Sequence, residues 1–255
     1  MNSPSIQIAE KQIYTDEEFS KIDLSRVPKH IAIIMDGNRR WAEKEGKPPE
    51  MGHWFGAEQL DLIVRASSEL GIKIVTAYSF STENWNRPSN ELKVLMQLLR
   101  AYLINKRESL VKEGVRLHAI GETELFPEGV QKALHETIQA TKNNDRIELV
   151  LALNYGGRDE IRRAFIKLHH AILEEGIDPS TISEKMISSY LDTARWPDPE
   201  LFIRPSGEMR LSNFLIWQSS YSELYTTKTL WPEFCEKELL NAIIEFQRRS
   251  RRYGR

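Results

Sequence analysis

Residues 30–42, with the sequence HIAIIMDGNRRWA, join an apolar run to a cluster of charges. The stretch begins without polar alternation, which is typical of a strand covered on both faces of a sheet. It ends with two arginines and a tryptophan, and Asp36, Gly37 and Asn38 stand between the two parts. A carboxylate, a glycine and two cations at the end of a strand suit a metal ion and a phosphate better than they suit a core.

Similar apolar runs recur along the 255 residues, and helical patterns separate them. The predicted strands are 31–35, 74–80, 115–120, 147–153 and 201–203. The predicted helices are 56–70, 90–113, 128–143, 158–175, 183–192 and 235–250. Strands that alternate with helices indicate a parallel sheet. We therefore expect an α/β fold, a single domain over residues 29–255 with a central, mostly parallel sheet flanked by helices, preceded by a polar N-terminal arm over residues 1–28.

Composition excludes several classes of protein. The formal net charge is −2, so no global basic field points to nucleic acid, and we expect no nucleic-acid partner. Cys235 is the only cysteine, which rules out an intramolecular disulfide and a cysteine-based zinc site. The polar N-terminus lacks the apolar core of a signal peptide, and no apolar stretch approaches the length of a membrane span. We expect a cytoplasmic protein.

Polar loops follow four of the predicted strands. In an open parallel sheet, ligands bind outside the carboxyl ends of the strands. The loops read DGNRRW, STENWNRP, NYGGR and RPSGEMRLSN, and they are rich in arginine but contain few carboxylates. Arginine forks match phosphate oxygens, and magnesium is usually held by one or two carboxylates with substrate phosphates. Turns and surface ion pairs are the alternative explanation for any one loop, but four such loops at one edge favour a magnesium–diphosphate site.

Five blocks in order carry a family resemblance. MDGNRRWA, GHWFGA, YSFSTENWNRP, NYGGR and IRPSGEMRLSNFLIWQSSYSELY together resemble the cis-isoprenyl transferases, especially the bacterial undecaprenyl diphosphate synthases. The resemblance covers the chain from about residue 29 to its end. It implies a homodimer with an apolar tunnel and a requirement for Mg²⁺. It also implies a reaction in which isopentenyl diphosphate extends an allylic diphosphate, typically farnesyl diphosphate, with cis geometry.

The resemblance also assigns roles to individual residues. Asp36 matches the essential aspartate and Glu223 a second magnesium ligand, while Asn84 matches the residue assigned as proton acceptor. A carboxamide is a poor base, so our hypothesis is that Asn84 orients a water or a diphosphate oxygen that takes the proton. The remaining matches are to substrate-binding positions: Gly37, Asn38, Arg39, Arg40, Trp41, His53, Ser81, Thr82, Glu83, Trp85, Arg87, Arg204, Arg210, Leu211 and Ser212.

Some positions depart from the family pattern or allow two interpretations. Arg39 replaces a common glycine, and Pro49 stands where bacterial members usually carry a phosphate-binding arginine, so Arg39 is a candidate to supply the lost contact. Pro205 replaces a hydroxyl residue and removes a backbone donor. Ser79 is either a small tunnel-lining residue or a small core residue. The pair of glycines at 156 and 157 either serves the site or makes a tight turn.

The sequence thus predicts an enzyme that makes a long polyprenyl diphosphate, with undecaprenyl diphosphate, a lipid-carrier precursor for cell-wall glycans, as the expected product. The alternatives are the same chemistry with a shorter or longer product, a non-catalytic subunit of a two-chain transferase, and a phosphate-binding hydrolase. A long apolar product also implies transient membrane contact for its release. The C-terminal residues 252–254, RYG, resemble a family element that reaches the partner subunit's active site.

Overall fold

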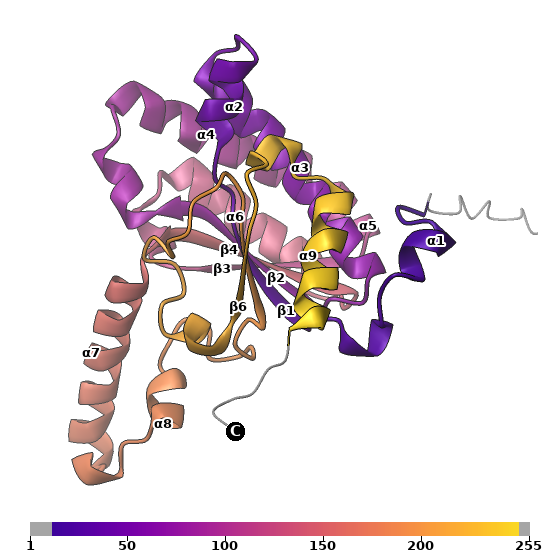
Figure 1. Cartoon of the computed structure of the whole chain (residues 1–255). Helices are drawn as coiled ribbons and strands as arrows, with labels where there is room; N and C mark the ends of the chain where they lie inside the picture. Colours follow the sequence, from indigo (N-terminus) through magenta and orange to yellow (C-terminus); the bar gives the residue numbers. More distant parts are fainter. Residues whose placement is uncertain (1–11, 250–255) are drawn as a thin grey trace, which may run out of the picture.

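The computed structural model describes residues 12–249, and within them six strands form one sheet in the order β3-β4-β2-β1-β5-β6 (Figure 1). Every neighbouring pair of strands is parallel. The predicted α/β fold with a central parallel sheet is confirmed. The strands are β1 (His30–Ile34), β2 (Ile74–Ser81), β3 (Val115–Ile120), β4 (Ile147–Tyr155), β5 (Leu201–Arg204) and β6 (Glu223–Thr226). β6 was not predicted, because its four residues are all half-buried and form no apolar run.

Helices flank the sheet as predicted, with several differences, among them a helix predicted over 183–192 that spans only Glu184–Ser188. The helices are α1 (Asp16–Phe19), α2 (Asn38–Lys44), α3 (Pro49–Glu69), α4 (Ser89–Asn105), α5 (Arg107–Lys112), α6 (Glu128–Thr141), α7 (Gly157–Glu175), α8 (Glu184–Ser188) and α9 (Glu236–Arg248). The helix predicted over 90–113 is two helices that meet at Lys106, whose ammonium reaches back to carboxylates of α3. α3 begins earlier than predicted, with a proline in its first turn. α2 was not predicted.

The order of the strands places a switch point beside β1. α3, α4, α5 and α6 connect strands on one side of β1, whereas α7 and α8 lead across to β5 on its other side. Figure 1 shows α7 and α8 extending below the sheet, away from α3, α4 and α6 above it. Ligands of open α/β sheets bind where the winding reverses, at the carboxyl ends of the strands. The carboxyl ends of β1 and β5 are that place here.

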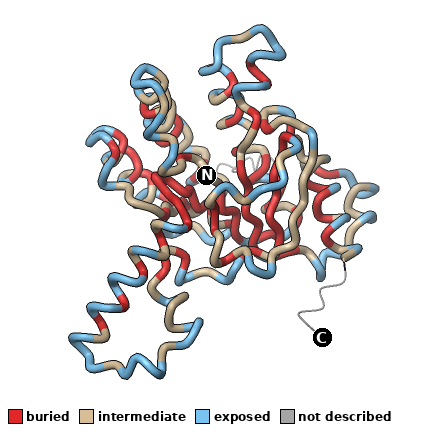
Figure 2. Tube along the Cα trace, turned by 60° about the vertical axis from the view of Figure 1, so that its left-hand side comes forward, coloured by how far each residue is buried: buried red, intermediate tan, exposed pale blue. Residues whose placement is uncertain are grey.

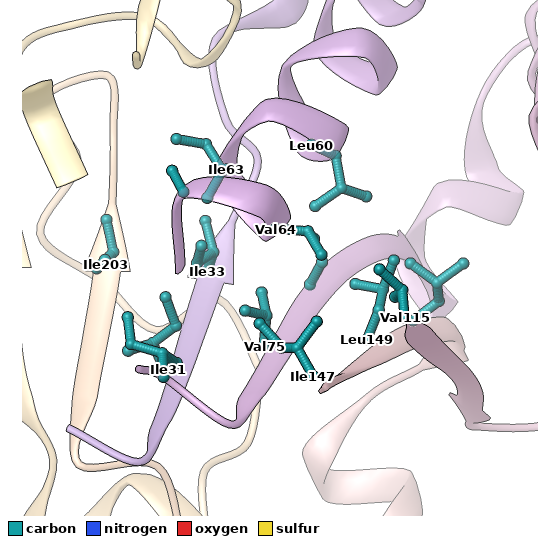
Figure 3. Packing of buried hydrophobic residues seen from close by; sticks show 14 of the residues in the cluster. Ile31, Ile33, Leu60, Ile63, Val64, Val75, Val115, Ile147, Leu149 and Ile203 are labelled. Carbon is teal, nitrogen blue, oxygen red and sulfur yellow. The ribbon is translucent and has the colours of Figure 1, made fainter. Parts of the chain in front are cut away.

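The core has a layer on each face of the sheet. Ile31 and Ile33 belong to the larger cluster, which includes residues of α3, α4, α6 and α9, and Figure 3 shows the part of it under Leu60 and Val64. Ala32 and Ile34, which point to the opposite face, pack with Phe202 and Phe214 in the smaller cluster. Figure 2 shows burial concentrated in the sheet and mixed exposure along α7.

Part of the N-terminal arm is fixed to this core. Tyr14 is fully buried, and its hydroxyl donates to the carbonyl of Glu236 at 3.1 Å. The Glu69 carboxylate, at the end of α3, accepts from the backbone N–H groups of Ile13 and Tyr14. Within residues 12–249, no helix is long and apolar enough to cross a bilayer.

Candidate active site

The carboxylate of Asp36 lies between two arginines at the switch point. Asp36 follows β1, and its Oδ1 accepts from Arg40 Nη2 at 3.1 Å while its Oδ2 accepts from Arg204 Nη2 at 2.9 Å. Arg204 ends β5, and its side chain is only 4% exposed. Burial alone would raise the pKa of Asp36, but the hydrogen bond and charge of Arg204, together with the charge of Arg40, hold it below the usual range. The carboxylate therefore stays ionised.

Arg204 organises the loop that follows its own strand. Its Nη1 donates to the carbonyl oxygen of Arg210 and, at 2.8 Å, to Ser212 Oγ. Its Nε–H is buried and has no hydrogen-bond partner among the described residues. A buried donor without a partner costs free energy unless a ligand accepts from it. This part of the site is therefore suited to an anion.

Arg40 is held by a residue that sequence reasoning missed. Its Nη2 donates to Ser206 Oγ at 2.7 Å and its Nη1 to the Ser206 carbonyl at 3.1 Å. Ser206 has a left-handed backbone, with φ of 76°, and Glu208 lies 3.6 Å from Arg40 Nη1. In the sequence, a serine before a glycine indicates only a turn, so no local signal marked Ser206.

The donor set fits a magnesium ion that is shared with a substrate. Magnesium prefers oxygen ligands and usually takes one or two carboxylates, with phosphates and water completing its shell. Asp36 and Glu208 are the carboxylates that Arg40 brings to one place. No group of three or more histidine, cysteine or acidic side chains in residues 12–249 could hold a metal by itself. The residues present therefore fit the ion only together with a diphosphate.

Gly37 and Asn38 shape the start of α2. Gly37 has φ of 103°, and a Cβ on it would lie 2.9 Å from the Leu230 side chain, so both conformation and space require glycine. Asn38 donates from Nδ2 to the carbonyl of Met35 at 3.2 Å, and its buried Oδ1 has no partner among the described residues. Asn38 is one of the residues that line the pocket described below.

Two other predicted cradle residues of α2 face elsewhere. Arg39 pairs with Glu43 one turn along the helix and its side chain is 69% exposed, so the structure does not bring it to Asp36. Trp41 is buried against Phe55 of α3, with ring centroids 4.8 Å apart. Trp41 fixes α2 to α3, which is a packing role.

An apolar pocket opens behind Asn38, between α3, α4 and the sheet. Its volume is about 610 Å³ including the open mouth, and Trp231 and Ser79 lie on its wall, so the tunnel interpretation of Ser79 is supported. His53 also lines the pocket, and burial and then the charge of Arg87 lower its pKa below 6.5, which favours the neutral imidazole at pH 7. Leucine is the commonest residue of the lining: Leu60, Leu95, Leu98, Leu99 and Leu151.

Asn84 lies in the 3-10 turn Thr82–Asn86 that follows β2. Its Oδ1 accepts from the backbone N–H of Ser81 at 3.1 Å, which leaves the amide NH₂ as the group able to meet a ligand. Beside it, Trp85 is 37% exposed and donates from Nε1 to Asn154 Oδ1 at 2.7 Å. Arg87 pairs with Glu91 at the start of α4. The turn is therefore tied to β4 through Asn154, a buried residue with a left-handed backbone.

Asn213 joins three of the sequence blocks, and sequence reasoning missed it as well. Its Nδ2 donates to Glu83 Oε1 at 2.9 Å, and its Oδ1 accepts from the backbone N–H of Arg158 at the same distance. Its carbonyl accepts from the N–H of Gly157. A Cβ on Gly156 would lie 2.7 Å from Thr82 Oγ1, so this glycine permits a close approach within the site and is more than a turn residue.

The structure keeps Glu223 and Leu211 apart from this cluster and attaches Arg210 to it only through Glu208 and its own carbonyl. Glu223 starts β6 and pairs in register with Leu201, which places it at the opposite edge of the sheet from Asp36, where it pairs with Arg249 at 3.1 Å. Leu211 packs in the smaller core cluster, and the exposed Arg210 side chain pairs with Glu208. The predicted element at 252–254 lies outside the described residues.

Comparisons with known proteins agree on one family. A family model described as "Putative undecaprenyl diphosphate synthase" matches residues 34–254. The chain is 49% identical to an isoprenyl transferase of Heliobacterium mobile, over 92% of this chain and 90% of that protein. It is 47% identical to an isoprenyl transferase of Chlamydia pneumoniae, over 91% of this chain and 94% of that protein.

Two solved structures share the fold over nearly the whole chain. Lavandulyl diphosphate synthase from Lavandula x intermedia, crystallised with dimethylallyl diphosphate, has a TM-score of 0.88 at 34% identity and covers 91% of this chain and 100% of its own. A probable undecaprenyl diphosphate synthase from Campylobacter jejuni has a TM-score of 0.74 at 32% identity, and the match covers 89% of this chain and 99% of that one.

Proposed function

This chain belongs to the cis-isoprenyl transferase family, and from that premise we propose that it condenses isopentenyl diphosphate with an allylic diphosphate, with farnesyl diphosphate as the starter. One observation carries the proposal: a carboxylate held by two arginines, Asp36, stands in the chain between Met35 and Asn38, and both of these residues line an apolar pocket. The charged end suits a diphosphate and the pocket suits a prenyl chain. In the reaction, the allylic C–O bond breaks, a C–C bond forms to isopentenyl diphosphate, and a proton and diphosphate leave.

The arginines stabilise the charge that develops as diphosphate departs. Arg40 and Arg204 are fixed before substrate arrives, by Ser206 and Ser212 respectively, so they need little reorganisation during the reaction. Preorganised donors of this kind usually make the largest catalytic contribution. When bound, Mg²⁺ would supply further neutralisation of the diphosphate, and Asp36 with Glu208 would hold it. The neutral His53 supplies a hydrogen bond near the mouth without adding charge.

The apolar pocket protects the reacting carbon. Leucines, Trp231 and the Ser79 segment surround the space in which the allylic chain would lie. A water-free wall prevents water from trapping the electron-poor allylic carbon. The Oδ1 of Asn84 is engaged by the backbone N–H of Ser81 and its amide NH₂ can donate to a ligand, so we assign it the role of orienting a diphosphate oxygen or a water that accepts the proton. It does not act as a base itself.

We propose a long polyprenyl diphosphate as product, in the size class of undecaprenyl diphosphate, which serves as a lipid-carrier precursor. The many bacterial isoprenyl transferase relatives and the undecaprenyl diphosphate synthase model support this size class. A shorter product is the second candidate, since the lavandulyl diphosphate synthase structure has the same fold. A non-catalytic subunit is disfavoured because both Asp36 and Asn84 are present.

Exposed apolar side chains support a homodimer and membrane contact. Phe165 and Leu173 are about 70% exposed on α7, the helix that extends away from the sheet (Figure 2), and they would be covered by a second subunit. Trp54 and Phe55, each 40% exposed, lie on the first turns of α3 beside His53. They provide an apolar surface for release of the product into a bilayer.

Incubation of the purified chain with farnesyl diphosphate, labelled isopentenyl diphosphate and Mg²⁺ tests the proposal. Chromatography of the product is expected to show a long polyprenyl chain. Asp36→Ala should abolish it. Asp178→Ala should not, because the Asp178 carboxylate accepts from the backbone N–H of its near neighbour Ser180. Absence of any product from the parent chain with several allylic starters would overturn the proposal.

A further inference from the structure

A side-chain amide connects the loop after β5 to the turn after β2. Asn213 Nδ2 donates to Glu83 Oε1 at 2.9 Å, although the two residues are 130 positions apart in the chain. Glu83 directly precedes Asn84 in the same 3-10 turn. Asn213 directly follows Ser212, whose Oγ accepts from Arg204 Nη1 at 2.8 Å. The bond between Asn213 and Glu83, called the amide bridge below, therefore joins the neighbour of one site residue to the neighbour of another.

Asn213 is held from several directions on its own side of the amide bridge. Its Oδ1 accepts from the backbone N–H of Arg158 at 2.9 Å, and its carbonyl accepts from the N–H of Gly157 at 2.6 Å, both in the first turn of α7. The next residue, Phe214, is fully buried and stacks on Tyr78 with ring centroids 4.4 Å apart. Because both oxygens of Asn213 are engaged, the direction of its NH₂ group is fixed.

The turn that carries Asn84 has little packing of its own. None of the residues 82–86 is buried, and the side chains of Glu83 and Trp85 are exposed. Trp85 ties one side of the turn to Asn154, and Glu83 ties the other side to Asn213. Segments with few buried contacts open easily unless such bonds hold them. The amide bridge is thus one of the contacts that decide where Asn84 lies.

The amide bridge is a charge-assisted hydrogen bond. Burial opposes ionisation of Glu83, but the hydrogen bond from Asn213 outweighs it together with further hydrogen bonds, so that the pKa of Glu83 is lowered. The carboxylate therefore accepts as an anion, and bonds of this kind are stronger than those between neutral groups. Replacing the donor of Asn213 by an acceptor would turn this attraction into repulsion.

We propose that Asn213 is a positioning residue for the reaction, and that its bond to Glu83 fixes Asn84 relative to the diphosphate at Arg204 and Ser212. The inference rests on the proposed function, in which Asn84 orients the group that accepts the proton. Asn213 acts through Glu83 and need not touch either substrate. A displacement near 1 Å at a reacting group costs roughly 10²-fold in rate, so loss of the amide bridge should act on turnover.

Binding of the allylic diphosphate should depend little on the amide bridge. The hydrogen bonds of Asp36 run to Arg40 and Arg204, and Arg40 is held further by Ser206. These bonds leave the turn after β2 aside. A variant without the bridge should therefore show a lower kcat with an unchanged KM for farnesyl diphosphate, a split that a general loss of structure would not produce.

Exchanging donor and acceptor across the amide bridge tests this role. Asn213→Asp keeps the acceptor for Arg158 and suits the left-handed backbone, where φ is 62°, but it faces Glu83 with a second carboxylate. Glu83→Gln alone keeps an acceptor oxygen for Asn213. In the double variant Glu83→Gln/Asn213→Asp, the glutamine NH₂ can donate to the aspartate, so the bond is restored in the reverse direction.

Steady-state kinetics with farnesyl diphosphate, isopentenyl diphosphate and Mg²⁺ measure the effect. We expect Asn213→Asp to lower kcat roughly 10²-fold and to leave KM for farnesyl diphosphate within twofold of the parent's. Glu83→Gln should lose less, and the double variant should turn over roughly tenfold faster than Asn213→Asp, because the two changes compensate each other.

Asn144→Asp is the matched control, because it makes the same change at the opposite edge of the sheet. Asn144 lies between α6 and β4, and its Nδ2 donates to the carbonyls of Leu110 and Val115. The variant should lose stability, yet well below its Tm its kcat should equal the parent's. An equal loss of kcat in Asn144→Asp would overturn the inference.

The remaining outcomes separate this inference from the proposed function. A double variant no faster than Asn213→Asp overturns the inference alone, as does a parental kcat in Asn213→Asp. If Asn213→Asp does not fold, as judged by circular dichroism, Asn213→Gly replaces it, because glycine keeps the left-handed backbone and removes the bridge. A parental kcat in Asn213→Gly then overturns the inference. A parent chain that makes no polyprenyl product overturns the proposed function instead.

Discussion

Substitution of Gly156 by alanine should disturb three loops of the site at once. The new Cβ would lie 2.7 Å from Thr82 Oγ1 and 2.8 Å from Asn213 Nδ2, whereas ordinary contacts begin at 3.4 Å. The atoms must therefore separate by about 0.7 Å, which is 3.4 minus 2.7. Overpacking of this kind costs roughly 1–3 kcal/mol of stability, and a displacement near 1 Å at reacting groups costs roughly 10²-fold in rate.

Steady-state kinetics with both substrates, together with a urea unfolding curve, measure these two effects. We expect kcat/KM of Gly156→Ala to fall roughly 10²-fold while the protein stays folded. Gly129→Ala is the matched control: its nearest neighbour would lie 3.4 Å away, and in α6 alanine is favoured over glycine by roughly 0.5–1 kcal/mol. Activity of Gly156→Ala within threefold of the parent would refute the reasoning.

Four further predictions concern the site and the sheet. Asn84→Asp should lower kcat about 10²-fold at neutral pH. The rate should recover as the pH falls toward the pKa of the new carboxyl, since only the protonated carboxyl can donate a hydrogen bond. Full activity of Asn84→Ala would exclude a role for Asn84 as a donor. Burial lowers the pKa of His30 from 6.5 to about 4, so unfolding takes up a proton between these values, and the free energy of unfolding should fall by about 3 kcal/mol from pH 7 to pH 4. Urea unfolding of His30→Asn, whose side chain does not titrate, should show a smaller fall in the free energy of unfolding between pH 7 and pH 4. An equal fall in the parent and in His30→Asn would contradict this prediction. Asn154→Gly keeps the left-handed backbone but loses the bond to Trp85, so kcat/KM should drop about fivefold with a red shift of tryptophan emission; an unchanged spectrum would argue against it. Chelation of magnesium should stop turnover without lowering Tm, because no three-ligand metal cluster lies within residues 12–249, and a large fall in Tm would point to a structural metal.

The sequence predicts the strands that are buried on both faces, and it misses elements that depend on tertiary contacts. β1 to β5 are apolar runs, so they were found, whereas residues 223–226 form a half-buried edge strand. α2 starts at Gly37 with a left-handed φ and is held by the contact of Trp41 with Phe55. Neither feature has a periodic pattern.

Site residues at strand ends were likewise predicted from the sequence, whereas site residues that depend on tertiary contacts were not. Asp36, Arg40 and Arg204 were predicted because they lie at or just beyond strand ends that meet at one edge of the sheet. Ser206 and Asn213 were missed because they act through left-handed backbone and through bonds to loops distant in sequence. Glu223 was assigned as a metal ligand from the resemblance, and it is the first residue of its strand. The rule about carboxyl ends does not place it near Asp36.

The two oxygens of Asp36 make the two halves of the site depend on each other. Arg40 reaches one oxygen from the DGNRRW block and Arg204 reaches the other from the RPSGEMRLSN block. An anion that draws one guanidinium away leaves more of the carboxylate charge on the other. If the two diphosphates of the proposed reaction bind at Arg40 and at Arg204, their affinities would be linked, and linkage is reciprocal: the factor by which one diphosphate changes binding of the second equals the factor in the reverse direction. A dissociation constant for either substrate would then have meaning only at a stated concentration of the other.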